Sequence, residues 1–325
     1  MKRLLEVAAS NGVDTAQVLR KISLSPEALE ASDTHYTVEQ HIQSIAIIKS
    51  LANIPALGLM VGASISIADL GIMGYAMLSS RSFGDAIEVA MRFQRLTDPV
   101  LHLRHRIEDD EVVVTIEPLT VLGEAFEYDV EETLAIWARL LHDCIGGDEK
   151  LKSARVSWRR PDYWQEYHRY LGCHVSFEQE VNEFRFVARL LSHPLMMANE
   201  QASRICEQEC EILLKELSRG QTIVDDVRRV LIRTPGEFPS LDVVANSLNM
   251  SSRNLRRRLS DSDTTFRKVA EEVRMQLAVQ YLSDTSLPIE QVSFLVGYTE
   301  ASNFHRAFKR HFEKTPNELR SDLTQ

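Results

Sequence analysis

The last third of the chain contains one pattern twice, and the two copies lie about 48 residues apart. Each copy begins with an apolar helical segment, Leu241–Leu248 in the first and Ile289–Val296 in the second. A residue that adopts the left-handed conformation at low energy then follows, Asn249 or Gly297. This conformation lets a chain leave one helix and start another at a steep angle. The pattern predicts two helix-turn-helix units, at residues 241–262 and 289–312.

The turn and the second helix of each unit carry further signals. Small residues, Ala245 and Ser293, stand four positions before the turn residues and permit close approach of the two helices. Ser251 and Thr299 are predicted to cap the second helix by accepting one of its backbone N–H groups. Apolar residues then recur four apart, which predicts a buried stripe. They are Leu255 with Leu259, and Phe304 with Phe308.

The opposite face of each second helix is predicted to be exposed and basic. A helix with this face fits the major groove of B-DNA, where arginine reads guanine and asparagine or serine meets other base edges. The candidate DNA-binding residues are Arg253, Arg256, Arg257, Ser302, Asn303, Arg306, Lys309 and Arg310. One such face alone is more typical of a solvated surface, but two in tandem with matching turns favour DNA recognition.

A single amphipathic helix is predicted between the two units, over Phe266–Leu282. A helix of about 17 residues spans about 25 Å. The second helix of each unit is called the recognition helix. Together with the width of both units, the length of the connecting helix suits recognition helices set about one DNA turn apart, or ~34 Å.

The region Leu241–Arg320 resembles the DNA-binding domain of the AraC/XylS family of bacterial transcription regulators. The stretches that carry the resemblance are Met250–Leu259, Arg274–Ala278 with Tyr281–Leu282, Leu295–Arg310 and Thr315–Arg320. It implies base or backbone contacts from Arg253, Arg256 and Arg257 in the first unit, and from Ser302, Asn303 and Arg306 in the second. The family usually places glycine after each recognition helix, where this chain has Asp263 and Glu313. We therefore expect strained or differently shaped turns there.

The N-terminal part is predicted to mix helices and strands. Helices are expected over Thr37–Leu51 and Glu127–Ile145, the latter ended by Gly146 and Gly147. Two extended runs around an acidic turn predict a β-hairpin over Leu101–Ile116. Further strands are expected over Ala154–Trp158, His174–Phe177 and Glu183–Val187. A helix over Leu195–Leu217 then ends at Ser218–Gln221, and a short helix is expected over Ile223–Ile232.

These elements predict an α+β chain with two domains. A mixed α/β effector and dimerisation domain at residues 1–217 is followed by a linker at 218–222. An all-α DNA-binding domain, in which a long helix joins the two helix-turn-helix units, is expected at 223–325.

The N-terminal part also resembles the arabinose-binding-like effector domain found in a subset of these regulators, over roughly residues 10–200. The matching stretches are Asp69–Tyr75, Leu78–Ser80, Leu171–Phe177 and Asn182–Phe184. The resemblance implies a domain that senses a small molecule and contributes to a homodimer. The apolar helix over Ile205–Leu217 is a further reason to expect dimerisation. No effector-binding residues are assigned.

Charge and composition limit the other classes of function. The net charge is −10, and from residue 221 onward 15 basic side chains stand against 14 acidic ones, so the acidity lies in the N-terminal part. This balance argues against coating nucleic acid by charge alone. No apolar run reaches about 18 residues and no signal peptide is evident, so we expect a cytoplasmic protein without membrane contact.

Other chemistry is not indicated by the sequence. His102 and His105 are three apart in a predicted strand and so point to opposite faces, which argues against a metal site. Gly58, Gly62, Gly71 and Gly74 lack the pattern of a phosphate-binding loop and are read as turn and close-packing glycines. Four cysteines make no disulfide framework. No set of acid, base and nucleophile is evident, so we expect no enzyme and no cofactor.

The expected function is a homodimeric, DNA-binding transcription regulator controlled by a small-molecule effector. The family's usual mode, activation through contact with RNA polymerase, is expected, although the sequence does not separate activator from repressor. One alternative is a ligand-independent dimeric regulator whose N-terminal domain only dimerises or binds another protein. A second is an enzyme tethered to DNA by its C-terminal domain.

Overall fold

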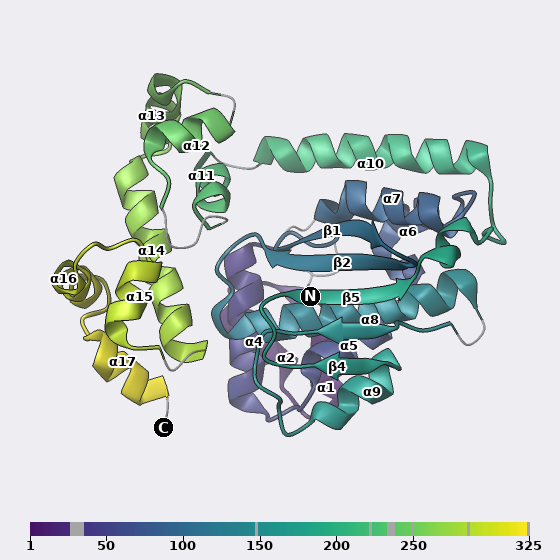
Figure 1. Ribbon diagram of the computed structural model, residues 1–325, viewed down its shortest axis with the longest axis horizontal. Helices are drawn as coiled ribbons and strands as arrows, with labels where there is room; N and C mark the ends of the chain where they lie inside the picture. Colours follow the sequence, from purple (N-terminus) through teal and green to yellow (C-terminus); the bar gives the residue numbers. More distant parts are fainter. Residues whose placement is uncertain are drawn as a thin grey trace. The chain divides into compact units, whose positions relative to one another are not determined.

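The computed structural model divides the chain into two compact units. It describes residues 1–26, 36–146, 149–220, 223–232, 238–248, 250–284 and 287–323. Unit 1 comprises Met1–Pro118 and Glu124–Glu216, and unit 2 comprises Leu119–Gly123 and Leu217–Gln325. Unit 1 combines a sheet with helices, whereas the elements described in unit 2 are helices (Figure 1). This division agrees with the α+β prediction.

The described residues of unit 1 form one five-stranded sheet in the order β1-β2-β5-β3-β4. The predicted hairpin is confirmed, because β1 (Leu101–Glu108) pairs antiparallel with β2 (Glu111–Pro118). Asp109 makes the turn with φ 51°. The other predicted strands are also present, although β3 ends three residues earlier than expected. They are β3 (Ser153–Arg155), β4 (His174–Ser176) and β5 (Asn182–Val187).

The two faces of this sheet differ in chemistry. On one face, Phe184 of β5 lies 5.3 Å from Trp137, and Phe186 lies 6.0 Å from Phe83, between ring centroids. These partners belong to α8 (Phe126–Ile145) and α7 (Phe83–Phe93), so both helices cover this face. The other face carries ion pairs within β5 and between β5 and other strands, centred on Glu183 and Arg185. Alternation of apolar and charged residues in the strands produces this division.

Helix α5 (Leu57–Ser64) packs against α8 through two glycines. A Cβ atom added to Gly62 would lie 2.2 Å from the carbonyl oxygen of Glu132, and one added to Gly58 would lie 2.4 Å from that of Tyr128. The interpretation of these residues as close-packing glycines is therefore confirmed. The other helices of unit 1 outside the short 3-10 turns are α1 (Lys2–Ser10), α2 (Thr15–Lys21), α4 (Val38–Leu51), α6 (Gly71–Leu78), α9 (Trp164–Leu171) and α10 (Glu200–Gly220).

Helix α10 is longer than predicted at its C-terminal end. The sequence predicts a break at Ser218–Gln221, but the helix continues to Gly220. Serine and arginine are tolerated in a last helical turn, and glycine is favoured at a helix end, so the break comes later. Gln221, and the expected linker beyond Gly220, lie outside the described residues.

Unit 2 is built on a single apolar core of helix side chains. Val269 and Val273 of the long helix α14 (Phe266–Asp284) are fully buried in it. The predicted helix over Ile223–Ile232 is confirmed with the same bounds as α11. The remaining helices are α12 (Leu241–Ser247), α13 (Ser252–Asp261), α15 (Ile289–Leu295), α16 (Ala301–Phe312) and α17 (Pro316–Leu323).

Candidate nucleic-acid interface

Both predicted helix-turn-helix units are present, as α12–α13 and α15–α16. The two turns contain equivalent hydrogen bonds. The N–H of Met250 donates to the carbonyl of Ala245 (2.8 Å) in the first turn, and the N–H of Tyr298 donates to the carbonyl of Ser293 (2.9 Å) in the second. Ala245 and Ser293 are fully buried, which confirms that small residues allow the helices to approach. Gly297 has φ 79°, as a left-handed turn requires. Asn249, the predicted turn residue of the first unit, lies outside the described residues.

Of the two predicted helix caps, one is confirmed and the other is wrong. Ser251 caps α13, because its side chain accepts the backbone N–H of Asn254 at 3.3 Å. The prediction for Thr299 is wrong, since α16 begins one residue later with Glu300 as its cap and without a side-chain cap bond. Six positions separate Asn249 from the first buried residue of α13, whereas seven separate Gly297 from Phe304. The second turn therefore contains one additional residue.

The recognition helices expose the faces that the sequence predicts. Leu255, Leu259, Phe304 and Phe308 are all at most 1% exposed and anchor α13 and α16 in the core. All eight candidate residues are exposed to solvent on the opposite sides: Arg253, Arg256, Arg257, Ser302, Asn303, Arg306, Lys309 and Arg310. The fold thus gathers three arginines on α13 and a polar, basic set on α16.

Several of these side chains are free to meet a ligand. The side chains of Arg253, Arg256 and Lys309 make no hydrogen bond or ion pair with the residues that the structure describes. Arg310 instead forms an ion pair with Glu271 of α14. The unpaired cations give α13 and α16 positive charge that no neighbouring carboxylate neutralises, which suits contact with a polyanion.

Each recognition helix contains its own asparagine–arginine pair, and the pair of the first unit was not predicted from the sequence. Arg257 donates to Oδ1 of Asn254 at 3.2 Å, and Arg306 donates to Oδ1 of Asn303 at 3.0 Å. Each asparagine stands one residue before the first buried side chain of its helix. Aligning the two copies on Leu255 and Phe304, rather than on the turn residues, would have revealed this repeat. Asn254 therefore joins the candidate interface.

The residues that replace the family's usual glycines keep a left-handed backbone. Asp263 has φ 54°, and Glu313 has φ 59° with ψ 2°. The N–H of Glu313 donates to the carbonyl of Lys309 at 2.9 Å, and that of Thr264 donates to Leu259 at 3.0 Å. Of the two expectations, a strained or a differently shaped turn, this backbone fits the strained one. What remains is the conformational energy of a side chain in this region of backbone space.

Unit 1 contains buried polar groups that the sequence did not point to. Nε2 of His41 lies 2.7 Å from Oδ1 of Asp129, and both side chains are buried. Nearby on α8, Glu131 accepts hydrogen bonds from the hydroxyls of Tyr163 (2.9 Å) and Tyr167 (2.5 Å). Burial raises the pKa of Glu131 to about 7, against the opposing effect of these two hydrogen bonds.

The described ranges contain neither a cluster of metal-ligating side chains nor a single membrane-spanning helix. No three or more His, Cys, Asp or Glu side chains are placed there to hold a metal ion. No single helix in the same ranges is long and apolar enough to cross a membrane. The segments Leu57–Ser64 and Ile67–Leu78 together reach that length and composition, but they are bent by 87°.

Comparison with known proteins matches both units. Residues 12–195 match the family described as the arabinose-binding domain of AraC transcription regulator, N-terminal, and residues 244–322 match a helix-turn-helix domain family. An ornithine utilization regulator of Pseudomonas aeruginosa is 32% identical over 98% of this chain and 94% of its own length. An uncharacterized HTH-type transcriptional regulator of Mycobacterium tuberculosis is 29% identical over 97% of this chain and 93% of its own length. The solved structure of the regulator CdpR from Pseudomonas aeruginosa aligns with a TM-score of 0.44 and 23% identity, covering 94% of this chain and 96% of its own.

The first family model covers more than half of the chain, and the helix-turn-helix model covers the tandem units that carry the exposed arginines. The relative from Pseudomonas aeruginosa extends the match over nearly the whole length. This relative and the one from Mycobacterium tuberculosis are both named as regulators. The chain is thus a DNA-binding transcription regulator that belongs to the AraC family and has an arabinose-binding-type N-terminal domain.

Proposed function

We propose that this regulator reads a specific promoter sequence with α13 and α16 in successive major grooves. The observation that carries the proposal is the repeated asparagine–arginine pair on two exposed helix faces. Arginine pairs with guanine O6 and N7, and asparagine pairs with adenine, so each helix has the donors that discriminate bases. Arg253 and Arg256 on α13 add unpaired donors.

Selection of bound sequences from a random duplex library tests this proposal. The purified full-length protein at physiological salt is expected to enrich a bipartite motif whose two elements lie about one helical turn apart. Enrichment of a single element, or of none, would contradict tandem reading.

Variants then assign the reading residues. Arg256→Ala and Arg306→Ala are each expected to weaken binding to the selected duplex by about 1–3 kcal/mol more than to a random duplex. Arg204→Ala is the matched control, because Arg204 is an exposed arginine on α10 in unit 1. Equal weakening on both duplexes would show that the two arginines contact phosphate only.

The effector is a second part of the proposal. Unit 1 matches an arabinose-binding domain family, which supports control by a small molecule. The similarity to an ornithine utilization regulator makes ornithine and other basic amino acids the first compounds to try. A ligand that binds only the folded state raises the melting temperature of the protein as the ligand concentration increases. If neither these compounds nor a wider metabolite set shifts the melting of unit 1, the ligand-independent alternative is favoured.

We further propose that α10 forms the homodimer contact. Ile205 and Ile212 lie seven residues apart, which places them on one helix face, and they are 58% and 48% exposed. Exposed isoleucines at this spacing suit pairing with a second copy of the helix. Ile205→Lys with Ile212→Lys is expected to convert a dimer to a monomer in sedimentation experiments, whereas Arg204→Ala leaves the dimer intact. A wild-type monomer would overturn this assignment.

The mode of regulation completes the proposal. A dimer that places both recognition helices beside a promoter in the bacterial cytoplasm is positioned to contact RNA polymerase and activate transcription. Transcription in vitro from a promoter that carries the selected motif is expected to increase when the protein is added. A decrease would instead indicate a repressor.

A further inference from the structure

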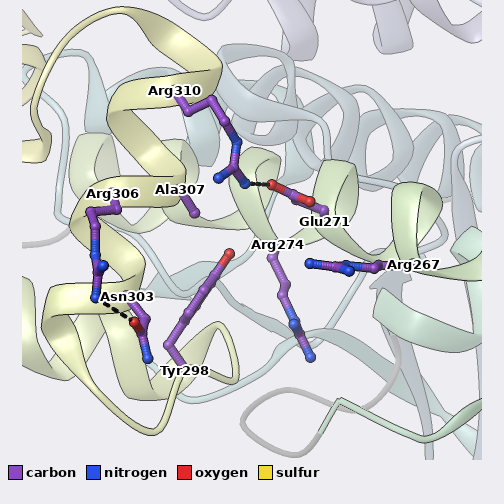
Figure 2. A pocket seen from close by; sticks show the side chains of 8 residues that line it. All are labelled: Arg267, Glu271, Arg274, Tyr298, Asn303, Arg306, Ala307 and Arg310. Atoms are coloured by element: carbon purple, nitrogen blue, oxygen red, sulfur yellow. Dashed lines mark hydrogen bonds and ion pairs between the residues drawn. The ribbon is translucent and has the colours of Figure 1, made fainter.

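Unit 2 contains an arginine-lined pocket of about 340 Å³ beside the recognition helix α16. Figure 2 shows its side chains, which come from α14, from the turn before α16 and from α16 itself. The lining residues are Arg267, Glu271, Arg274, Tyr298, Asn303, Arg306, Ala307 and Arg310. Four guanidinium groups therefore share the pocket with one carboxylate.

The pocket contains donors that the protein does not use. Arg267 makes no hydrogen bond or ion pair with any described residue, and it is exposed. Nε of Arg274 is buried without a hydrogen-bond partner. The Arg274 guanidinium lies 4.7 Å from the ring centroid of Phe238 and 5.5 Å from that of Tyr298. The aromatic rings fix this arginine in place, and an unsatisfied buried donor favours an anionic partner.

The position of the pocket relative to α16 indicates which anion it meets. Ser302 and Lys309 are exposed on α16 and do not line the pocket, whereas the buried Ala307 lines it together with the base-reading candidates Asn303 and Arg306. The pocket therefore opens along one flank of α16, between that helix and α14. When a helix lies in the major groove, its outer face meets the bases and its flanks face the two phosphate backbones.

We propose that this pocket binds one phosphate of the DNA backbone, held by Arg267 and Arg274 and then by Arg310. The proposal rests on the proposed DNA-binding function. Glu271 occupies the place of the phosphate in the free protein, because its carboxylate pairs with Arg310 there (Figure 2). Binding of the duplex releases Arg310 from Glu271 and transfers it to the phosphate. The pocket thereby fixes the depth and direction of α16 in the groove.

Affinity for a random duplex at several salt concentrations tests the pocket without any known operator. Arg267→Gln is expected to weaken binding about tenfold and to reduce the slope of log affinity against log salt by about one. Glu271→Gln is expected to have the opposite effect on affinity and to tighten binding of the random duplex roughly three- to fivefold, since Arg310 no longer has a competing carboxylate. Lys268→Gln is the control, because Lys268 is exposed on α14 but does not line the pocket. The proposal is overturned if Arg267→Gln matches this control, or if Glu271→Gln fails to tighten binding.

A second experiment separates a backbone phosphate from a free one. Single neutral methylphosphonates are placed at successive positions of the duplex recovered by selection. One position is expected to weaken binding of the wild type about tenfold and to weaken binding of Arg267→Gln by a smaller factor, because only Arg274 and Arg310 then lose their charged partner. Pyrophosphate is titrated against the protein without DNA, and only weak, millimolar binding is expected. Tight pyrophosphate binding that Arg267→Gln abolishes, without any sensitive duplex position, would overturn the proposal in favour of a free phosphorylated ligand.

These outcomes are separate from failure of the proposed function. A protein that selects no sequence still binds random duplexes through its phosphates, so the salt experiment remains informative. Circular dichroism melting of each variant verifies that Arg267→Gln and Glu271→Gln keep the fold, as substitutions outside the core are expected to do.

Discussion

Replacing Glu313 by glycine is expected to stabilise α16, the second recognition helix. Glu313 has φ 59°, and a Cβ atom in this left-handed region costs roughly 1–2 kcal/mol. Glycine removes that cost but gives the unfolded chain more freedom, which opposes the gain by about 0.4–1 kcal/mol. The side chain of Glu313 makes no hydrogen bond or ion pair with a described residue. Its negative charge at the helix C-terminus is unfavourable by a further few tenths of a kcal/mol.

The net expectation for Glu313→Gly is a stabilisation of about 1 kcal/mol. The three tryptophans all lie in unit 1, so their fluorescence does not report on α16. Hydrogen exchange of α16 peptides by mass spectrometry measures local opening directly. A gain of 1 kcal/mol corresponds to amide exchange slower by about fivefold.

Glu313→Ala separates backbone strain from charge, because alanine keeps the Cβ atom and removes only the carboxylate. It is expected to change exchange by less than about twofold. Asp263→Gly is expected to gain less than Glu313→Gly, since aspartate tolerates the left-handed region better than glutamate. If glycine and alanine at position 313 gave the same exchange rates, the strain would not lie in the left-handed backbone and the reasoning would be refuted.

Three other predictions concern stability and binding. Gly62→Ala is expected to lower the melting temperature of unit 1 and cost at least about 1–3 kcal/mol in chemical denaturation, because its Cβ would collide with the carbonyl of Glu132; wild-type stability would contradict this contact. The buried carboxyl of Glu131 has a pKa raised to about 7, so the folded state holds its proton longer than the unfolded state and stability falls as pH rises from about 4.5 to 7. Glu131→Gln is expected to remove that part of the decline in urea unfolding at pH 5 and pH 8, whereas an unchanged decline would place its cause elsewhere. Lys309→Ala is expected to weaken selected and random duplexes equally and to lower the salt slope, and a loss confined to the selected duplex would show base reading.

The helix-turn-helix units were predictable because their signals are local. The four-residue recurrence of Leu255 with Leu259 places one face in the core, and this recurrence alone exposes the arginines opposite. The cap of α16 was missed because the second turn contains one residue more than the first. Repeats matched at a turn lose their register at such an insertion, which also hid the equivalence of Asn254 and Asn303.

The pocket beside α16 and the polar groups of unit 1 were not predictable in this way. Arg274 and Tyr298 are 24 positions apart and meet only because α14 packs against the second unit. Glu131 stands among other acidic residues of α8, Asp129 and Glu132, and its partner Tyr167 lies 36 positions later on α9. Periodicity reports which face of one helix is buried, but it does not say which distant side chain the buried face meets.

The two glycines of α5 restrict the movements that are possible within unit 1. Gly58 and Gly62 let α5 approach the backbone of α8 more closely than any residue with a Cβ atom allows. Sliding α5 along α8 by one residue would bring Leu57 or Leu59 against the same carbonyl groups, where no space exists. Sliding of one helix along the other is therefore opposed by a clash between side chain and backbone. A conformational change within unit 1 is therefore expected to tilt or shift α5 and α8 together rather than to change the alignment of one along the other.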